Sequence, residues 1–586
     1  MKKTVFALLG LVALQSFAAP VQVVDTHGKP LATVMVSRQP VKAAVLDTSD
    51  EGYPASGKLQ QSYIELTRFT DSQGRADIPA AEHAWKLRLR KAGYKDRIVS
   101  PAEASKPVVM QAETDPAELA AQRPSNAWTS TIDFGDAALK KEFMLQCNYC
   151  HQQGGALLRR ERSADEWKEA MKRMVRYGSR LSSEAREKIP ALLEAHWKDI
   201  AAHPEKVPAG TPWSADLSKV TVREMPVGDA MSQMHDLLVH SNGKVYIGDN
   251  LQDRLYEIEP TTGKFTVFHV PKQDGDRLGG LMPGRLVDFP KHQTYQGIHS
   301  LAESTKDGHI FLTPSHQRRL IEFDPVSKQF VQHEMERGFY PHTVRIDAKD
   351  RVWFTLALSN QVAMFDRTTK QFTYYDLPAR SFMEGLTIKL TPTLMGLTRF
   401  GIPVANLVKV DHQSTGVPLP YGLDITPDGK VWIARLYTNE IGVIDPDKGS
   451  VTMIATPFTA PRRLRADAQG NLWIAAFNES LIARYNPAKA EFTTFDLPVV
   501  PKGSDTPYSL NVDRQRNQVW VNGTNSDSVY RFDIAAGKWN VYPMQRKVTF
   551  TRDVEITKDG KAYVSGAAFP SWHIEDQQPT LMEITP

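Results

Sequence analysis

The alternation of apolar and polar residues divides the chain into three regions. From about residue 20 to 111, short segments alternate with a period of two between turn residues. Between about 131 and 205 the apolar residues recur every three to four positions, and from about 215 to 586 the period of two returns. A period of two predicts strands and a period near 3.6 predicts helices. We therefore expect β structure, then a helical region, then a long β region.

The first region has the pattern of a small β-sandwich. Its predicted strands are 21–24, 32–36 and 85–90. The pieces that carry a family resemblance are 25–31, 70–76 and 91–94. They resemble the carboxypeptidase-regulatory-like modules of the transthyretin type, and the resemblance implies a docking or spacer role without chemistry. A polar linker at 112–130, rich in Ala, Glu, Pro and Ser, follows.

Helix signals mark the second region. Ser163 and Glu166 form a predicted capping box, in which the hydroxyl and the carboxylate satisfy free amides at a helix start. Five apolar residues then fall on one helix face: Trp167, Ala170, Met171, Met174 and Val175. Ser182 is placed to cap a second helix, which we expect Pro190 to kink or to end after its first half.

A repeat occupies the third region. It recurs every 41 to 47 residues from Met234 onward, apart from two longer gaps. Such a period indicates a propeller, and seven copies predict seven blades. The predicted second strands of the copies are 244–247, 309–312, 351–354, 430–433, 471–474, 518–521 and 561–564. The longer gaps hold insertions at 273–295 and 379–417, which we expect on the surface. The second insertion is apolar enough to cover a funnel, to contact a partner or to cover the propeller side.

Both cysteines of the chain lie in Cys147-Asn148-Tyr149-Cys150-His151, the Cys-x-x-Cys-His signature of c-type haem attachment. Residues three apart in a helical turn face the same side, so both thiols can bond one porphyrin while the histidine binds its iron. A zinc site would need further ligands, and no cysteine remains. A thiol-disulfide motif would lie in a βαβ unit. The motif therefore predicts one covalent haem c with His151 as proximal ligand.

The distal ligand is predicted from a resemblance. The residues Trp167, Met174, Gly178, Leu181 and Ser182 resemble small class I cytochrome c domains that accompany periplasmic oxidoreductases. The resemblance implies Met174 as distal iron ligand, and a thioether raises the reduction potential, which suits electron transfer. If Met174 is a core methionine instead, Met171 and His196 are the remaining candidates.

One position at the start of each repeat collects polar side chains: His235, His299, His342, Tyr421, Arg462, Tyr508 and Arg552. In a propeller this position crowds the central axis. Three histidines from consecutive blades could converge on one metal, a second metal beside the haem iron, or on one substrate. Arg435, Arg462 and Arg552 would add positive charge for an anionic group. A ring that only plugs the channel by hydrogen bonds is the other interpretation.

The repeat unit Pro420–Ile433 resembles the streptogramin B (virginiamycin B) lyases, which are seven-bladed propellers, and the resemblance extends over some 350 residues. In that family the reaction uses a histidine and acidic residues with a magnesium ion, the acid often following the aromatic strand. Among the seven matching stretches here, only Asp249 is acidic. The resemblance therefore implies the fold, and we expect no lyase activity.

The N-terminus predicts export. Lys2 and Lys3 precede an apolar run at 5–14, and small residues lead to a cleavage site after Ala18, so 1–18 reads as a secretory signal peptide. The run is shorter than the roughly 20 residues of a membrane span. We expect no integral membrane segment in the mature chain. A net charge of +4 gives no case for a nucleic-acid partner.

The predicted architecture is multidomain and mainly β: a sandwich at 20–111, an all-α class I cytochrome c domain at 131–205 and a seven-bladed propeller at 215–586. We expect a periplasmic mono-haem cytochrome that acts in electron transfer or as an oxidoreductase. Its propeller mouth would bind an anionic substrate or a periplasmic electron donor or acceptor. The alternatives are a non-enzymatic binding or redox-sensing propeller and a metal-dependent lyase of the streptogramin type.

Overall fold

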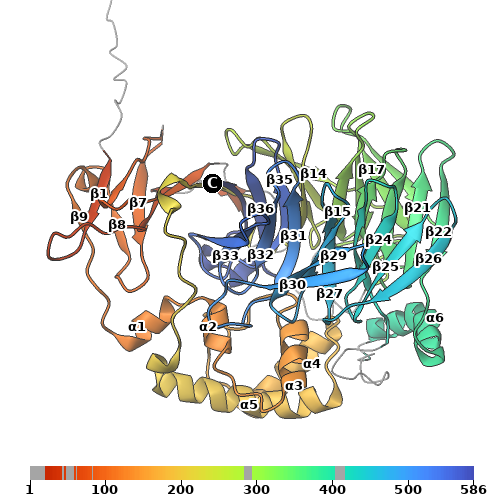
Figure 1. The fold of residues 1–586 in the computed structure, drawn as a ribbon, viewed down its shortest axis with the longest axis horizontal. Coiled ribbons are helices and arrows are strands. Elements are labelled where there is room, and N and C mark those ends of the chain that lie inside the picture. The colour runs from red at the N-terminus through yellow and green to blue at the C-terminus, as the bar shows by residue number, and fades with distance from the viewer. Residues whose placement is uncertain are drawn as a thin grey trace, which may run out of the picture.

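The computed structural model describes residues 20–41, 45–47, 58–60, 63–81, 83–282, 294–400, 402, 416–569 and 571–586. The predicted signal peptide and parts of both insertions lie outside the described residues. Figure 1 shows three parts: two small sheets at the N-terminal side, a large ring of sheets, and helices along one end of that ring.

Six four-stranded antiparallel sheets follow one another along the described chain. The first three are β11 (Met234–Val239), β12 (Val245–Asp249), β13 (Arg254–Ile258) and β14 (Phe265–His269); β15 (Ile298–Glu303), β16 (Ile310–Pro314), β17 (Arg319–Phe323) and β18 (Phe330–Glu334); and β19 (Pro341–Ile346), β20 (Val352–Leu356), β21 (Gln361–Asp366) and β22 (Gln371–Asp376). The next three are β23 (Pro420–Ile425), β24 (Val431–Arg435), β25 (Glu440–Asp445) and β26 (Ser450–Ala455); β27 (Pro461–Ala466), β28 (Leu472–Ala476), β29 (Leu481–Asn486) and β30 (Glu491–Asp496); and β31 (Pro507–Asp513), β32 (Gln518–Gly523), β33 (Ser528–Asp533) and β34 (Lys538–Pro543).

The seventh blade closes the ring. It joins β35 (Thr551–Ile556), β36 (Ala562–Gly566) and β37 (Thr580–Thr585) to β10 (Thr221–Pro226), which pairs antiparallel with β37. The first strands of successive blades contact each other in chain order, and β35 contacts β11. The described strands therefore form a closed, seven-bladed propeller.

The predicted second strands are confirmed. Each begins within one residue of its predicted start and ends two residues later, at β12, β16, β20, β24, β28, β32 and β36. These strands are buried almost throughout, with Trp353, Trp473 and Trp520 fully enclosed between blades. An aromatic-rich run bounded by turn residues is typical of a strand packed on both faces.

The N-terminal strands form two sheets that share an apolar core containing Val23, Val36 and Leu89. One sheet has the order β6 (Arg75–Ala76), β1 (Val21–Val24), β9 (Val108–Val109). The other has the order β5 (Glu65–Phe69), β2 (Met35–Pro40), β7 (Trp85–Arg90), β8 (Arg97–Val99), and its strand β5 pairs antiparallel with β10. A further pair consists of β3 (Val45–Asp47) and β4 (Lys58–Gln60). The second sheet thus continues the seventh blade into one eight-stranded sheet.

A buried arginine joins the N-terminal strands to the propeller. Arg546 donates to Glu65 Oε1 at 2.8 Å and also to Glu224. The side chains of Arg546, Glu65 and Glu224 are 3%, 3% and 1% exposed. Closer to the surface, Arg90 pairs with Glu575 at 2.9 Å. Ion pairs therefore cross the same junction as the β5–β10 hydrogen bonds.

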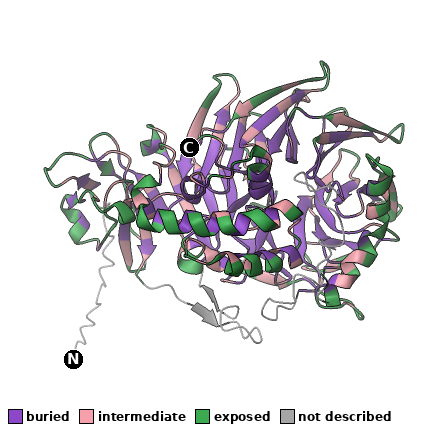
Figure 2. Cartoon of the chain, turned by 90° about the horizontal axis from the view of Figure 1, so that it is seen from below, coloured by how far each residue is buried: buried purple, intermediate pink, exposed green. Residues whose placement is uncertain are grey.

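The helical region contains α1 (Pro116–Ala121), α2 (Ser125–Thr129), α3 (Ala137–Gln146), α4 (Ala164–Arg176) and α5 (Ser183–Ala202), and these helices share one apolar cluster. Short 3-10 turns are η1 (Glu103–Ser105), η2 (Pro204–Lys206), η3 (Leu217–Lys219), η5 (Thr398–Phe400), η7 (Ser571–His573) and η8 (Glu575–Gln577). The helices lie across one end of the propeller, and α5 turns a largely exposed side outward (Figure 2). Helices are few in the described chain, so a large, separate all-α domain is not evident.

Three local predictions can be compared with these helices. The capping box of Ser163 and Glu166 starts α4, and Ser182 caps α5, as predicted. Of the two effects expected of Pro190, a kink or a helix end, the helix end is wrong, because α5 runs through that residue. Packing of Ile189, Leu193 and nearby residues in the helical cluster outweighs the one lost hydrogen bond. The expected linker at 112–130 contains α1 and α2, and all residues of α2 are buried.

The described part of the second insertion forms α6 (Phe382–Leu397). Phe382 is 84% exposed and Leu390 is 45% exposed, whereas Leu394 and Met395 line a cavity at the end of the propeller. This helix therefore covers part of the cavity, in agreement with one of the three expected roles, and keeps an exposed apolar side.

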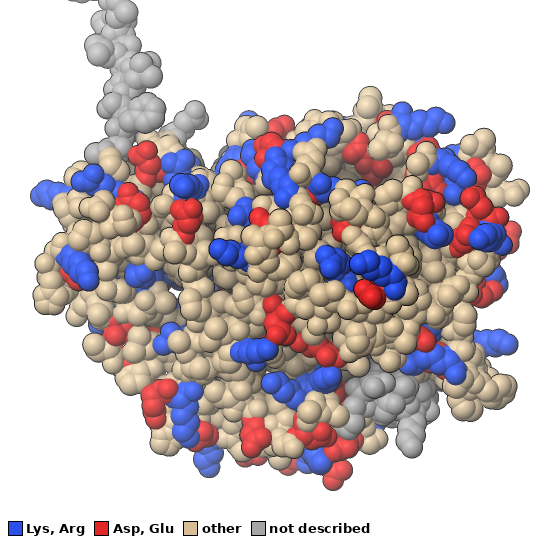
Figure 3. All heavy atoms as spheres, in the orientation of Figure 1, with Lys and Arg blue, Asp and Glu red and all other residues tan. Residues whose placement is uncertain are grey.

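The surface carries both signs of charge. Figure 3 shows Lys and Arg interspersed with Asp and Glu over the visible face, as expected for a chain of low net charge. Among the described residues, no helix has the length and apolar character that crossing a membrane would require.

Candidate functional site

β-Bulges aim seven side chains at the propeller axis. In every blade the register between the first and second strand shifts at the start of the first strand. The first residue inside each irregularity is the one that the repeat aligns: His235, His299, His342, Tyr421, Arg462, Tyr508 and Arg552. A bulge redirects a side chain out of the regular alternation of a strand. All seven are buried, and we call them the axial ring.

Three histidines of the axial ring contact one another. The ring centroids of His235 and His299 are 3.7 Å apart, and those of His299 and His342 are 4.0 Å apart. One ring nitrogen from each histidine lies within 4.8 Å of the other two. Burial lowers the pKa of His235 to about 3 against the opposing hydrogen bond to Asp236, and burial also lowers the pKa of His342. The imidazoles of His235 and His342 are therefore neutral at pH 7.

The other members of the axial ring form a hydrogen-bonded group. The hydroxyls of Tyr421 and Tyr508 are 2.7 Å apart, and Arg462 donates to Tyr421 at 2.9 Å. Tyr508 is also hydrogen-bonded to Nε2 of His235 at 2.9 Å. The guanidinium of Arg462 lies 3.5 Å from the centroid of Tyr508. The group therefore links the histidines to the cationic side of the axial ring.

Tyr508 has an unusual electrostatic environment. Burial on its own would raise the pKa of this phenol. The guanidinium groups of Arg462, Arg552 and Arg463 outweigh burial, so the pKa of Tyr508 is lowered. A phenol that ionises more easily and touches a histidine can exchange a proton with it.

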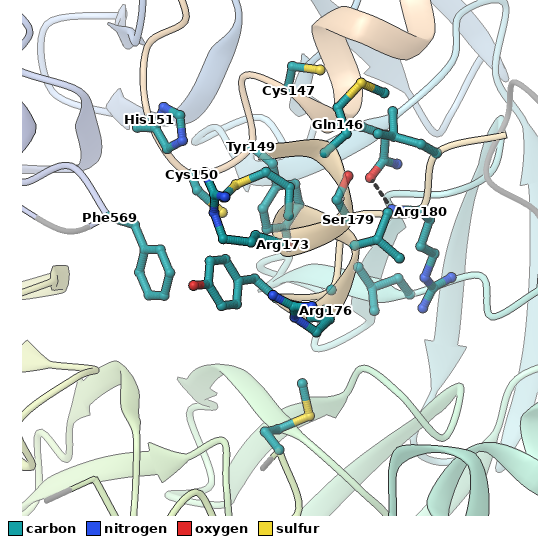
Figure 4. A pocket seen from close by; sticks show the side chains of 18 of the residues that line it. Gln146, Cys147, Tyr149, Cys150, His151, Arg173, Arg176, Ser179, Arg180 and Phe569 are labelled. Carbon is teal, nitrogen blue, oxygen red and sulfur yellow. Dashed lines mark hydrogen bonds between the residues drawn. The ribbon is translucent and has the colours of Figure 1, made fainter. Parts of the chain in front are cut away.

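The cysteine motif lies directly after α3. Cys147 is the last cap of that helix, and the turn that follows carries Cys150 and His151 (Figure 4). Burial raises the pKa of the Cys147 thiol, with Glu142 adding to the effect, and burial lowers the pKa of His151 to about 4. The imidazole of His151 stacks on that of His573, with centroids 4.5 Å apart.

One cavity of about 510 Å³ contains both groups of residues. Its wall includes Cys147, Cys150 and His151 on one side and the axial-ring residues His235 and His299 on the other. Ligand sites typically measure about 300–1,000 Å³. The cysteine motif and two of the three clustered histidines, far apart in the sequence, therefore open onto the same space; His342 does not line it.

Arg552 connects the two groups directly. Its Nη2 donates to the carbonyl oxygen of Cys150 at 2.8 Å, and its Nη1 donates to the hydroxyl of Tyr508 at 3.0 Å. Its Nε donates to Ala567 at 2.9 Å. A single side chain thus ties the cysteine motif to the axial ring.

The candidate distal ligands lie in different places. Met174, half-buried on α4, and Met171, buried one turn earlier, both line the cavity. His196 does not line it and packs against Trp197, with centroids 4.5 Å apart. The cavity therefore brings together both methionines with His151 and leaves His196 apart.

Arg435 is not part of the axial ring. It pairs with Glu440 at 2.8 Å and with Glu384 of α6 at 3.5 Å, and it does not line the cavity. Its charge is therefore balanced by these two carboxylates, one of them on α6, and is not available to an anion in the cavity.

Sequence reasoning missed four residues at the site. Asp236 accepts from His235 Nδ1, Arg463 pairs with Asp236, Tyr340 contacts His299, and His573 stacks on His151. The first three lie one or two positions from axial-ring residues, so the repeat alignment could have found them. His573 lies in η7, in a segment between β36 and β37 that has no counterpart in the other blades.

The fold and this site define a β-propeller with a cysteine-histidine motif at its mouth. No family model and no curated protein matches the chain. Solved structures with a similar fold include a streptogramin B lyase (TM-score 0.47, 14% identity, 62% of this chain and 97% of that one). Another is virginiamycin B lyase from Staphylococcus aureus (TM-score 0.46, 14% identity, 63% and 100%). A third is the hydrazine synthase of Kuenenia stuttgartiensis (TM-score 0.35, 14% identity, 46% and 74%).

Proposed function

We propose that the protein is a periplasmic mono-haem c-type cytochrome that acts as an oxidoreductase. Its haem is bonded to Cys147 and Cys150, with His151 as proximal ligand, and the helical region serves as its cytochrome c domain. The substrate, a small anion, enters the cavity beside the axial ring. A periplasmic redox partner exchanges electrons at the outer surface of the helices. The N-terminal sheets act as a carboxypeptidase-regulatory-like β-sandwich that supports this assembly.

The observation that carries the proposal is the shared cavity. A protein that only transfers electrons has no need for its haem motif to open onto a buried polar ring. Here Arg552 contacts both Cys150 and Tyr508, so a molecule bound at the axial ring would lie next to the haem. Haem at this position would accept or donate single electrons.

The residues around the cysteine motif fit a haem. Two thiols and a neutral imidazole line one cavity, and Met171 and Met174 reach the same space from α4. Arg173, Arg176 and Arg180 also line it, and guanidinium groups pair well with the carboxylates that a haem carries (Figure 4). The cavity thus offers attachment, axial ligation and charge balance.

The axial ring would perform the remaining work. Arg552 would hold an anionic group by its hydrogen bonds and charge. Tyr508 and His235, joined at 2.9 Å, would move a proton between the substrate and the interior as electrons leave or arrive. Helix α6 and the helical region would keep water out of the cavity.

The direct test is haem retention. The full chain, expressed with a c-type maturation system and recovered from the periplasm, should keep one haem per chain through acid-acetone extraction and denaturing electrophoresis. Thioether bonds resist both treatments. Haem lost under these conditions, or iron below one equivalent after full maturation, would refute the proposal.

Met174→Ala tests the distal ligand. If the thioether of Met174 binds iron, its loss should abolish a sulfur-to-iron band in the oxidised absorption spectrum and lower the reduction potential. The matched control is Met171→Ala, on the same helix and in the same cavity, which should mainly reduce stability, by about 2–5 kcal/mol for a buried methionine. If Met174→Ala leaves spectrum and potential unchanged while Met171→Ala alters them, Met171 is the ligand.

A further inference from the structure

We propose that His235, His299 and His342 bind one divalent transition-metal ion at the propeller axis, beside the haem motif. Copper(II) is the ion we expect to bind most tightly, because imidazole suits copper and copper heads the divalent affinity series. Three ligands leave a coordination position toward the cavity, as in catalytic metal sites. The site deepens the proposed oxidoreductase but rests on the histidine geometry alone.

The spacing of the histidines suits a single ion. The three candidate ligand atoms lie within 4.8 Å of one another. Copper(II) favours a tetragonal arrangement, in which nitrogens bound at about 2.0 Å lie about 2.8 Å apart when adjacent and about 4.0 Å apart when opposite, so the largest separation would shrink by roughly 0.8 Å. Rotation of buried rings that already contact each other can supply this change.

Each imidazole is oriented through one nitrogen by a neighbouring oxygen. Asp236 Oδ1 lies 2.8 Å from His235 Nδ1, and Thr343 Oγ1 lies 3.1 Å from His342 Nδ1. The hydroxyl of Tyr340 lies 3.3 Å from His299 Nε2. Metal-binding histidines characteristically donate their second nitrogen to such an oxygen. The opposite nitrogen of each ring is the candidate metal ligand. In His235 that nitrogen is Nε2, so metal binding would replace its hydrogen bond to Tyr508 and leave Tyr508 to move the proton.

The nitrogen of His342 is the clearest sign of a missing neighbour. His342 is 0% exposed, and its Nε2 has no hydrogen-bond partner among the described residues. A buried polar atom without a partner costs roughly 1–3 kcal/mol. Channel plugging gives no reason to keep that cost, because Tyr421 and Tyr508 fill equivalent positions and satisfy their hydroxyls. A bond from Nε2 of His342 to a metal ion would remove this cost.

The surrounding charges favour an anion on the metal. Arg463 is balanced by Asp236 and Asp553, with contacts of 2.5 Å and 3.4 Å. Arg462 and Arg552, in contrast, have hydroxyl, carbonyl and aromatic contacts in the described structure. A divalent ion beside them is best accommodated with a negatively charged fourth ligand, such as hydroxide or the anionic substrate.

Copper(II) binding tests the site on the full-length protein. After treatment with a chelator, titration with copper(II) should load one equivalent per chain beyond the haem iron, and its electron paramagnetic resonance should show coupling to three imidazole nitrogens. Haem is measured separately on the same sample. Copper binding without haem would refute the proposed function and leave this site intact. Haem without copper binding would refute this site and leave the proposed function intact.

Variants locate the ligands. His299→Gln and His342→Gln should each weaken copper binding more than about 100-fold, since loss of even an orienting partner costs 10–100-fold. The matched control is His240→Gln, a buried histidine bonded to the carbonyl of Gly308, which should bind copper like the wild type. Unchanged affinity in both cluster variants overturns the site. If the two cluster variants do not fold, the wild type decides: a copper electron paramagnetic resonance spectrum that shows coupling to fewer than two nitrogens overturns the site.

Discussion

Replacing Cys147 and Cys150 with alanine is expected to give a folded protein that carries no haem through denaturing electrophoresis. Both thioether bonds are lost, and His151 with a methionine would hold haem only by reversible coordination. The fold should persist, because Cys147 only borders the helical core and the propeller blades have apolar cores of their own. The measurement is haem staining after electrophoresis, with circular dichroism to confirm the fold.

The single variants and a methionine variant serve as controls. Cys147→Ala and Cys150→Ala should each retain part of the covalent haem through the remaining thiol. Met174→Ala should retain all of it, because that side chain forms no covalent bond. Haem that stays attached in the double variant would show that the cysteines do not hold it.

Replacing Arg546 with methionine is expected to destabilise the protein by about 3–5 kcal/mol, the usual effect of breaking a buried ion pair from one side. Glu65 and Glu224 would be left as two carboxylates without their shared partner in a site only 1–3% exposed. Because Glu65 lies on β5 and Glu224 on β10, the loss falls at the junction of the N-terminal sheet with the seventh blade. Urea unfolding of this variant and of the wild type measures the loss.

A triple variant separates the ion pair from the shape of the site. Arg546→Met combined with Glu65→Gln and Glu224→Gln removes all three charges, so it should recover much of the lost stability. If the triple variant is as unstable as Arg546→Met alone, the packing of the arginine side chain matters more than its charge. A change of less than about 0.5 kcal/mol in Arg546→Met would place the junction among ordinary surface contacts.

Much of the propeller could be predicted because its signals are local. A turn, an aromatic run and a second turn specify each blade, and the blades repeat, so an alignment also identified the axial ring. Arg435 lies where the repeat predicts it, at the end of a second strand, but its charge is paired with Glu440 and Glu384, partners that no repeat encodes. Local patterns thus predict where a residue lies better than where its side chain points.

The junctions could not be predicted, for a related reason. Pairing of β5 with β10 joins residues more than 150 positions apart, and the edge of a strand carries no sequence mark of its partner. The shared cavity depends on how the helices lie on the propeller, and that placement rests on contacts such as Arg552 with Cys150. The contact of His573 with His151 could not be predicted either, since only the assembled propeller brings the two residues together.

The helical region is held at both of its ends. The chain enters it from β9, within the N-terminal sheets, and leaves it into β10, the strand that closes the propeller; β5 then pairs those two parts together. A domain on a single flexible linker can shuttle between partners, as a carrier does. This region is connected at both ends to parts of the chain that are paired with each other, so we do not expect it to move away from the propeller as a unit. If this region carries the proposed haem, its redox partner would therefore have to be the mobile component, which docks against a stationary haem.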